Sequence, residues 1–202
     1  MNTPKRKFSV IGCGRVGICL SAFLFKKEYE PAGFFSRSRT SSQAARAAAG
    51  CGTVFDTAAD CARAGDIVFI TTPDGLIESI CSDLARQNAL GPETMVFHLS
   101  GAHSSGILAQ AKQLGAVVGS IHPLQSFAPY EPGQASPFKG INVSVEGDPD
   151  AVAQGKEIAA ALGARAFAIP TESKTLYHAS AVVASNYLVT LVRFALTLLM
   201  ET

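Results

Sequence analysis

The chain has 202 residues, of which 48% are hydrophobic and 16% are charged, and its formal net charge is +1. This length suffices for one well-packed core, or for one domain and part of another. The near-neutral charge gives no reason to expect nucleic acid or an anionic membrane surface as a partner.

Short apolar runs alternate with helical patterns over residues 7–123. Strands are predicted at 7–12, 32–37, 52–56, 66–73, 94–101 and 116–123. Helices are predicted at 16–27, 40–50, 58–64, 75–87 and 104–115. Alternation of this kind is typical of the α/β class, with a doubly wound, mostly parallel sheet.

The pattern changes after residue 123. Residues 123–140 are rich in Pro and Gly and predict a long loop, a kind of segment that often has a function in compact domains. One further strand–helix–strand unit is predicted at 141–147, 149–162 and 164–170. We therefore assign residues 1–170 to a Rossmann-type α/β domain.

Residues 171–202 contain neither Gly nor Pro and predict one long helix, the start of an all-α domain. A long apolar helix cannot bury itself alone, so we expect it to pack on a partner chain or on further helices of a truncated domain. Its most apolar stretch, 187–200, is short for a membrane span and carries Arg193. A buried or interface helix is favoured.

Three glycines follow the first strand with the spacing of a dinucleotide-binding turn. Gly12 would permit the tight turn, Gly14 would let a pyrophosphate approach the backbone, and Gly17 would let helix and strand pack closely. The helix N-terminus would offer N–H groups and a partial positive charge to the phosphates. A tight turn without ligand is the alternative. The candidate cofactor-binding residues of this turn are Gly12, Cys13, Gly14, Arg15, Val16 and Gly17.

The adenosine end of the predicted site lacks an acidic residue. In NAD-binding folds an Asp or Glu about 20 residues after the turn bonds the ribose hydroxyls. Ser36, Arg37 and Ser38 stand there instead. An arginine and two hydroxyls suit a 2′-phosphate, so this segment predicts NADP(H) rather than NAD(H). A solvated Arg/Ser loop is the alternative.

The five cysteines are odd in number and show no C-x-x-C spacing. This pattern is typical of a reduced, cytoplasmic protein without a disulfide framework or a zinc site, and no metal is predicted. The N-terminal residues are a poor signal peptide, because only a short apolar run precedes the glycines.

Polar residues follow three of the predicted strands, where ligands of doubly wound sheets bind. Ser100 follows the fifth strand and His122 ends the sixth. His98 lies within the fifth strand, and it could equally be a buried core histidine or a residue of the functional site. The residues after the fourth strand, at the same edge of the sheet and expected to contact the cofactor, are Thr71, Thr72 and Pro73.

The long helix provides the other polar group of residues. Lys174, His178, Ala181 and Ser185 fall on one helical stripe, with Asn186 at its flank. Polar groups in apolar helical sequence need a cavity or partners, so this stripe predicts one wall of a site. A solvent-facing stripe at the helix start is the alternative.

Several segments resemble a bacterial family of proteins assigned as NADP-dependent oxidoreductases. They are GCGRVG, TTPDGLI, FHLSGAHSSGIL, GSIHPLQSF, FKGINVSVEGD and KTLYHASAVVASNYLVTL. The family has a Rossmann-like N-terminal domain and a C-terminal helical domain of unknown function. More distantly, the chain is similar to 6-phosphogluconate dehydrogenase-like enzymes, among them pyrroline-5-carboxylate reductase, prephenate dehydrogenase and deazaflavin-dependent NADP reductases. Family members continue through more helices, which implies that residues 171–202 are the first helix of a truncated domain.

The resemblance implies the NADP(H) cofactor and the architecture, but it does not give a substrate. Our leading expectation is an NADP(H)-dependent oxidoreductase acting on a small keto, hydroxy or imino acid-like compound. His122 or His178 is the candidate acid/base, because a histidine suits proton transfer near neutral pH. Lys174, Ser100 and Asn186 would orient the substrate, since a Lys or His and an Asn of this helix meet substrate in the wider superfamily. A homodimer through the C-terminal helices is expected. A non-catalytic NADP(H) sensor, or an inactive cofactor-binding half, remains an alternative.

Overall fold

A computed structural model describes residues 6–25 and 29–201. Within these residues one eight-stranded sheet has the order β3-β2-β1-β4-β5-β6-β7-β8. Neighbouring strands are parallel except for the antiparallel pair of β6 and β7, which confirms the predicted mostly parallel α/β fold. The strands are β1 (Arg6–Ile11), β2 (Tyr29–Phe35), β3 (Thr53–Val54), β4 (Ile67–Ile70), β5 (Met95–His98), β6 (Val117–Pro123), β7 (Asn142–Gly147) and β8 (Arg165–Ala168).

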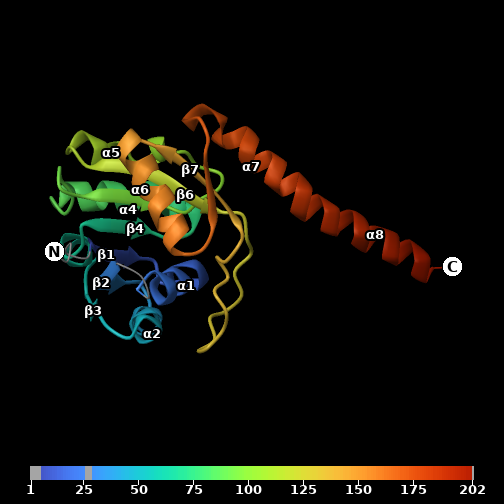
Figure 1. Ribbon diagram of the computed structural model, residues 1–202, viewed down its shortest axis with the longest axis horizontal. Coiled ribbons are helices and arrows are strands. Elements are labelled where there is room, and N and C mark those ends of the chain that lie inside the picture. Colours follow the sequence, from blue (N-terminus) through green and yellow to red (C-terminus); the bar gives the residue numbers. More distant parts are fainter. Residues whose placement is uncertain (1–5, 26–28, 202) are drawn as a thin grey trace.

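Helices cover both faces of the sheet (Figure 1). One apolar core lies under α1, α2 and α6, and the other lies under α3, α4 and α5. The helices are α1 (Arg15–Leu24), α2 (Arg39–Ala49), α3 (Ala58–Arg63), α4 (Asp74–Arg86), α5 (Ala109–Gln113), α6 (Pro149–Ala161), α7 (Lys174–Val182) and α8 (Leu188–Met200). Two 3₁₀ turns, η1 (Ser105–Leu108) and η2 (Thr171–Ser173), precede α5 and α7, and a π-helical turn, η3 (Val183–Tyr187), joins α7 to α8.

The sequence predicts most of these elements closely, and the differences lie at their ends. Gly50 ends α2 in the left-handed conformation, as the predicted C-terminal glycine should. The predicted third strand shrinks to two residues, and the helix predicted at 104–115 divides into η1 and α5. The predicted end of the first helix near Lys27 lies outside the described residues.

The loop after β6 is largely exposed but contacts α1 through an aromatic pair. Phe23 of α1 meets Tyr130 of the loop edge-to-face, with 6.3 Å between ring centroids. Within the loop, Phe127 and Phe138 pack with 5.0 Å between centroids. These aromatic contacts anchor both ends of a segment that has no regular secondary structure.

The C-terminal helix points away from the α/β domain as a rod (Figure 1). Only its start contacts the sheet, where the Lys174 side chain is buried. Beyond that, large apolar side chains are exposed on every side of it. By length and composition, Thr171–Met200 could also cross a membrane, with mean hydropathy 1.7, although a single such helix is weak evidence for a membrane protein.

Candidate functional site

The glycine turn lies at the carboxyl end of β1, next to the switch point between β1 and β4. Gly12 has a φ of +101°, and a Cβ there would lie 2.7 Å from the backbone of Thr72. A Cβ on Gly17 would lie 2.5 Å from the Gly12 carbonyl oxygen, so the helix can approach the turn only without a side chain. Above Gly14 the space is open. The three glycines therefore have the geometry that a bound pyrophosphate requires.

A cavity of about 480 Å³ extends from this turn along the carboxyl edge of the sheet. We call it the glycine-turn cavity. Thr71 Oγ1 donates a hydrogen bond to the Gly12 carbonyl oxygen at 2.5 Å, which ties the end of β4 to the turn. Thr72 Oγ1 is buried without a hydrogen-bond partner among the described residues. Of the predicted cofactor-binding residues, the cavity is lined by Gly12, Cys13, Gly14, Ser36, Arg37, Thr71, Thr72 and Pro73.

The remaining predicted cofactor residues lie outside that lining. Arg15 is exposed on the first turn of α1, and Val16 is half-buried beside it. Gly17 packs beneath the turn. The Ser38 hydroxyl accepts a hydrogen bond from the Ser41 N–H and caps α2, which leaves its O–H free to donate. Burial raises the pKa of Cys13 to about 11, so this thiol is neutral at physiological pH.

The two arginines at the adenosine end differ in their surroundings. Arg39 forms an ion pair with Asp56. The Arg37 guanidinium has no hydrogen-bond or ion-pair partner among the described residues, and it lines the glycine-turn cavity. The apolar side chains of Leu76 and Ile80 form the opposite wall. Arg37 is thus the cation that an anionic ligand group would meet in this cavity.

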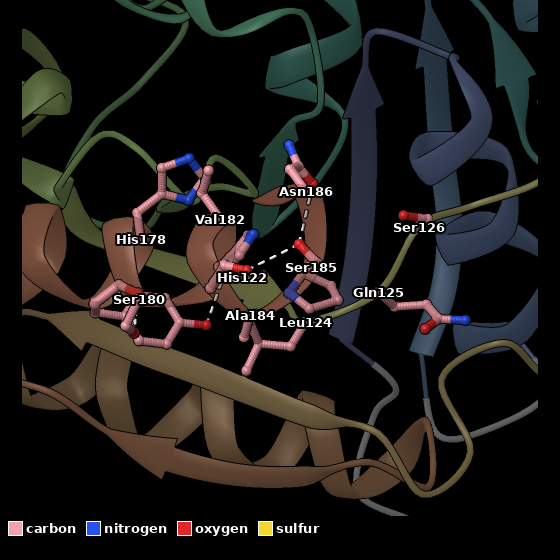
Figure 2. A pocket seen from close by; sticks show the side chains of 13 residues that line it. His122, Leu124, Gln125, Ser126, His178, Ser180, Val182, Ala184, Ser185 and Asn186 are labelled. Atoms are coloured by element: carbon pink, nitrogen blue, oxygen red, sulfur yellow. Dashed lines mark hydrogen bonds between the residues drawn. The ribbon is translucent and has the colours of Figure 1, made fainter. Parts of the chain in front are cut away.

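A second cavity, of about 680 Å³, lies between the carboxyl end of β6 and the C-terminal helix. We call it the histidine cavity (Figure 2). His122, Gln125 and Ser126 line it from β6 and the following loop. From the helix the lining residues are Tyr177, His178, Ser180, Ala181, Val182, Ala184, Ser185 and Asn186. The sequence predicted His178, Ala181, Ser185 and Asn186 on this wall.

The two histidines of this cavity face each other across Gly101. Their rings are 6.0 Å apart at nearly a right angle. A Cβ on Gly101 would lie 2.6 Å from His122 Nε2 and 2.5 Å from His178 Nδ1. His178 Nδ1 is buried and has no hydrogen-bond partner among the described residues. Gly101 therefore lets both rings pack closely against the turn after β5, because any side chain there would collide with the two ring nitrogens.

The other nitrogen of His122, Nδ1, lies 3.0 Å from the Tyr177 hydroxyl oxygen. Burial, and then the charges of Lys174 and His178, lowers the pKa of His122 to about 4. Burial raises the pKa of Tyr177, although the Ser144 hydroxyl opposes this rise. At neutral pH the pair is thus a neutral imidazole and a neutral phenol.

Asn186 lies in the π-helical turn, a distortion that occurs frequently at functional sites. Its side-chain oxygen accepts a hydrogen bond from Ser185 Oγ at 3.0 Å. Ser185 Oγ also lies 2.8 Å from the Ala181 carbonyl oxygen, so its single proton bonds one of these two oxygens at a time. The Asn186 side chain lines the cavity and carries both an amide NH₂ donor and an acceptor oxygen.

Beneath the histidine cavity the sheet carries a buried polar row. His98, Ser120 and Glu146 are register partners on β5, β6 and β7, and all three are buried. Glu146 accepts hydrogen bonds from the backbone N–H and the hydroxyl of Ser105, at 2.7 and 2.8 Å. These bonds satisfy a carboxylate that would otherwise be costly to bury.

Lys174 enters this row from the C-terminal helix. Its side chain is 1% exposed, and Nζ donates a hydrogen bond to Ser120 Oγ at 2.7 Å. Burial lowers the pKa of Lys174 to about 8, while the carboxylates of Glu146 and Asp74 act in the opposite direction. Lys174 therefore lies under the histidine cavity instead of lining it, although the helical stripe placed it beside His178.

Ser100 and His98 form hydrogen bonds that stabilise the turn after β5. Ser100 Oγ accepts hydrogen bonds from the N–H groups of Ala102 and His103, at 3.1 and 3.2 Å. His98 Nδ1 accepts from the Ser100 N–H at 3.2 Å. Burial, and then the charge of Lys174, lowers the pKa of His98 to about 3. His98 is thus a neutral core residue, and Ser100 holds Gly101 against the two histidines.

The sequence pattern did not indicate Tyr177 and Glu146 as site residues, and it placed Gly101 only at the end of the fifth strand. A charged residue within the buried strand 142–147 was a signal for Glu146, because a lone carboxylate is rarely fully buried. Tyr177 lies one turn after Lys174 and next to His178, but the predicted helical stripe contained those two residues and not Tyr177. No sequence signal placed Gly101 between two imidazoles, since this contact depends on three separate elements.

Known families match most of the chain. The model of a Rossmann-like domain matches residues 1–123, and that of a domain of unknown function, DUF2520, matches residues 141–202. No curated protein matches this chain in sequence.

Solved structures share the fold over nearly the whole chain. BF3122 of Bacteroides fragilis, assigned as an NADP oxidoreductase, superimposes with a TM-score of 0.79 at 18% identity, covering 98% of this chain and 73% of that one. TM1727 of Thermotoga maritima gives a TM-score of 0.69 at 27% identity over 95% and 70% of the two chains. Arogenate dehydrogenase of Synechocystis gives a TM-score of 0.71 at 20% identity over 88% and 63%. These matches confirm the resemblance, and the 98% coverage includes most of the C-terminal helix.

Proposed function

Because this chain belongs to the Rossmann-like domain family, we propose that it is an NADP(H)-dependent oxidoreductase. The observation that carries the proposal is the pairing of a glycine-turn cavity with a histidine cavity along one edge of the sheet. The matched solved structures include dehydrogenases, which is consistent with this assignment. The proposed substrate class is a small keto, hydroxy or imino acid-like compound.

The residues of the glycine-turn cavity fit a nicotinamide dinucleotide. Open space above Gly14, and an α1 N-terminus that no described side chain caps, suit the pyrophosphate. The unpartnered Thr72 hydroxyl can bond the ligand, and Arg37 can pair with a 2′-phosphate. When bound, such a cofactor supplies or accepts the hydride. Val16 and Gly17 shape the turn, and Ser36 and Ser38 frame the phosphate beside Arg37.

The histidine cavity provides the proton chemistry. His122 is the proposed acid/base, and His178 and the Asn186 amide hold the oxygen or nitrogen of the substrate. Lys174 acts on this group through its charge, which lowers the pKa of His122. Ser100 acts through Gly101, whose position it secures.

Turnover tests the proposal directly. The purified protein should consume NADPH with at least one member of a panel of small keto acids and imines. His122→Asn should lower kcat/KM by about 100-fold or more while it retains NADPH affinity, because it removes the acid/base. If the wild type binds NADPH tightly but turns over nothing in the panel, or if His122→Asn is fully active, the catalytic assignment is wrong.

Cofactor preference isolates the role of Arg37. We expect Arg37→Ala to weaken NADPH binding by about 10- to 100-fold and to leave NADH binding nearly unchanged, because only NADPH has the phosphate that Arg37 would bind. Fluorescence titration with both nucleotides measures this. Arg39→Ala is the matched control, since Arg39 pairs with Asp56. Equal loss for NADPH and NADH, or an equal effect of the control, would contradict the assignment.

The proposed partner is a second copy of the chain, packed through the C-terminal helices. Leu191, Phe194 and Leu198 are more than half exposed, and burying such side chains would stabilise a dimer by about 25 cal/mol per Å². We expect dimers in sedimentation velocity and monomers for Leu191→Glu. Ala160→Glu, on the exposed face of α6, is the control. A monomeric wild type would exclude this partner.

The free thiols of the chain agree with a reducing compartment, and we propose a cytoplasmic location.

A further inference from the structure

Tyr177 and His122 form a specific hydrogen bond in addition to their ring packing. Tyr177 belongs to α7 and His122 to β6, 55 residues apart in sequence, yet the phenol oxygen lies 3.0 Å from Nδ1. The two rings meet edge-to-face with 5.7 Å between centroids. This hydrogen bond joins the C-terminal helix to the strand that carries the proposed acid/base.

The direction of the bond follows from the available partners. Because burial raises the pKa of Tyr177, its phenol is protonated at neutral pH and needs an acceptor. Nδ1 of His122 is the acceptor at hydrogen-bond distance among the described residues. A neutral imidazole has one N–H and one acceptor nitrogen, so a bond accepted at Nδ1 places the proton on Nε2.

We propose that Tyr177 is the positioning residue of His122, holding its proton on Nε2 and replacing that proton when the substrate takes it. Nε2 lies close to Gly101 and to the Nδ1 of His178, which has no partner among the described residues, and both histidines line the histidine cavity. A substrate oxygen or nitrogen in that cavity would accept the Nε2 proton. The proposal rests on the proposed function for its catalytic part, but the tautomer is a property of the protein alone.

The proton transfer balances without a free imidazolate. As the substrate carbon receives the hydride from the reduced cofactor, its oxygen or nitrogen takes the proton from Nε2, and Nδ1 takes the proton from the Tyr177 hydroxyl. The ring stays neutral with its proton on Nδ1, and a phenolate remains. Water then protonates Nε2 while Nδ1 returns its proton to the phenolate, which restores the starting tautomer. Lys174 Nζ lies 5.8 Å from the centroid of the Tyr177 ring, so its positive charge stabilises the transient phenolate.

Without the Tyr177 phenol, His122 would have to donate its proton from the doubly protonated imidazolium form. Without the phenol, His122 can give up a proton at neutral pH only after protonation of its second nitrogen, and its pKa of about 4 makes that form scarce. A variant without the phenol should therefore become more active as the pH falls. The titratable groups around His122 are Lys174, Tyr177 and His178 from α7, Glu146 from β7, and His98 from β5.

The tautomer can be measured without any substrate. In protein labelled with nitrogen-15 histidine, ring-nitrogen chemical shifts distinguish protonated from unprotonated positions, and His122→Asn identifies the signals among four histidines. We expect His122 to carry its proton on Nε2 in the wild type and to lose that preference in Tyr177→Phe. A wild-type proton on Nδ1 would overturn the proposal whether or not turnover is ever observed.

The pH–rate profile provides the second measurement. We expect Tyr177→Phe to lower kcat at pH 7 by about 100-fold, with the deficit shrinking about tenfold per pH unit toward pH 5 while the wild type stays flat. Tyr130→Phe, a loop tyrosine that packs on Phe23, is the matched control. A uniform loss at every pH would indicate a merely structural role and would also overturn the proposal.

Discussion

Replacing Gly101 with alanine should lower kcat/KM by about 100-fold without unfolding the protein or weakening NADPH binding. The added methyl would lie 2.6 Å from His122 Nε2 and 2.5 Å from His178 Nδ1, which is far too close for either ring to stay in place. Both neighbours are ends of side chains, so the rings should turn away while the backbone holds. The substrate would then lose its proton donor and its second contact together.

Two measurements separate this effect from general damage. NADPH titration reports the glycine-turn cavity, and thermal unfolding reports the fold, where overpacking of this kind costs about 1–3 kcal/mol. Gly91→Ala is the matched control, because a Cβ at Gly91 would meet nothing within 4 Å. Full activity in Gly101→Ala would show that the facing histidine nitrogens do not hold the substrate.

The stability of the protein should rise as the pH increases from about 8 to 10.5, by about 3 kcal/mol, because of Lys174. The pKa of Lys174 is lowered from 10.5 to about 8 in the folded protein. Between these values the unfolded chain binds more protons than the folded chain, so folding gains free energy as the pH rises. Below about pH 8 the lysine is charged in both states, and the gain is absent.

Lys174→Met should remove this rise, as measured by urea unfolding at several pH values. Glu146→Gln should instead extend the rise to lower pH, since Glu146 raises the pKa of Lys174 and its loss would lower that pKa further. Lys156→Met, an exposed lysine of α6, is the control and should leave the pH dependence unchanged. An identical pH slope in Lys174→Met and the wild type would show that Lys174 is not the group responsible.

The parts of the protein that the sequence predicts well are those built from neighbouring residues. The glycine turn, the glycine that ends α2 and the alternation of strands and helices depend on contacts within a few positions, so the sequence pattern alone predicts them. The absent acid at 36–38 is of the same kind. It is local, and the structure adds that Arg37 has no ion-pair partner within residues 6–25 and 29–201, whereas Arg39 pairs with Asp56.

The helix wall was predicted only in part. One stripe contained Lys174 and His178, because residues four apart share a helical face. The structure separates them, since the buried row of Ser120 and Glu146 draws the ammonium into the sheet while the imidazole faces the cavity. Helical spacing predicts which face of the helix a side chain lies on. Whether that side chain is buried depends on the residues of the neighbouring strands that it contacts.

By itself, the sequence determined the fold class, the order of the elements, the turn suited to a dinucleotide and the two histidines as candidates. Only the tertiary structure decided that Gly101 separates those histidines, that Tyr177 bonds His122, and that Lys174 lies beneath them. Those contacts join residues of β6, α7 and the turn after β5, which lie far apart along the chain. The hydrophobic periodicity of a sequence indicates which face of a helix or strand is apolar. Only the packing of these elements decides which polar atoms come into contact.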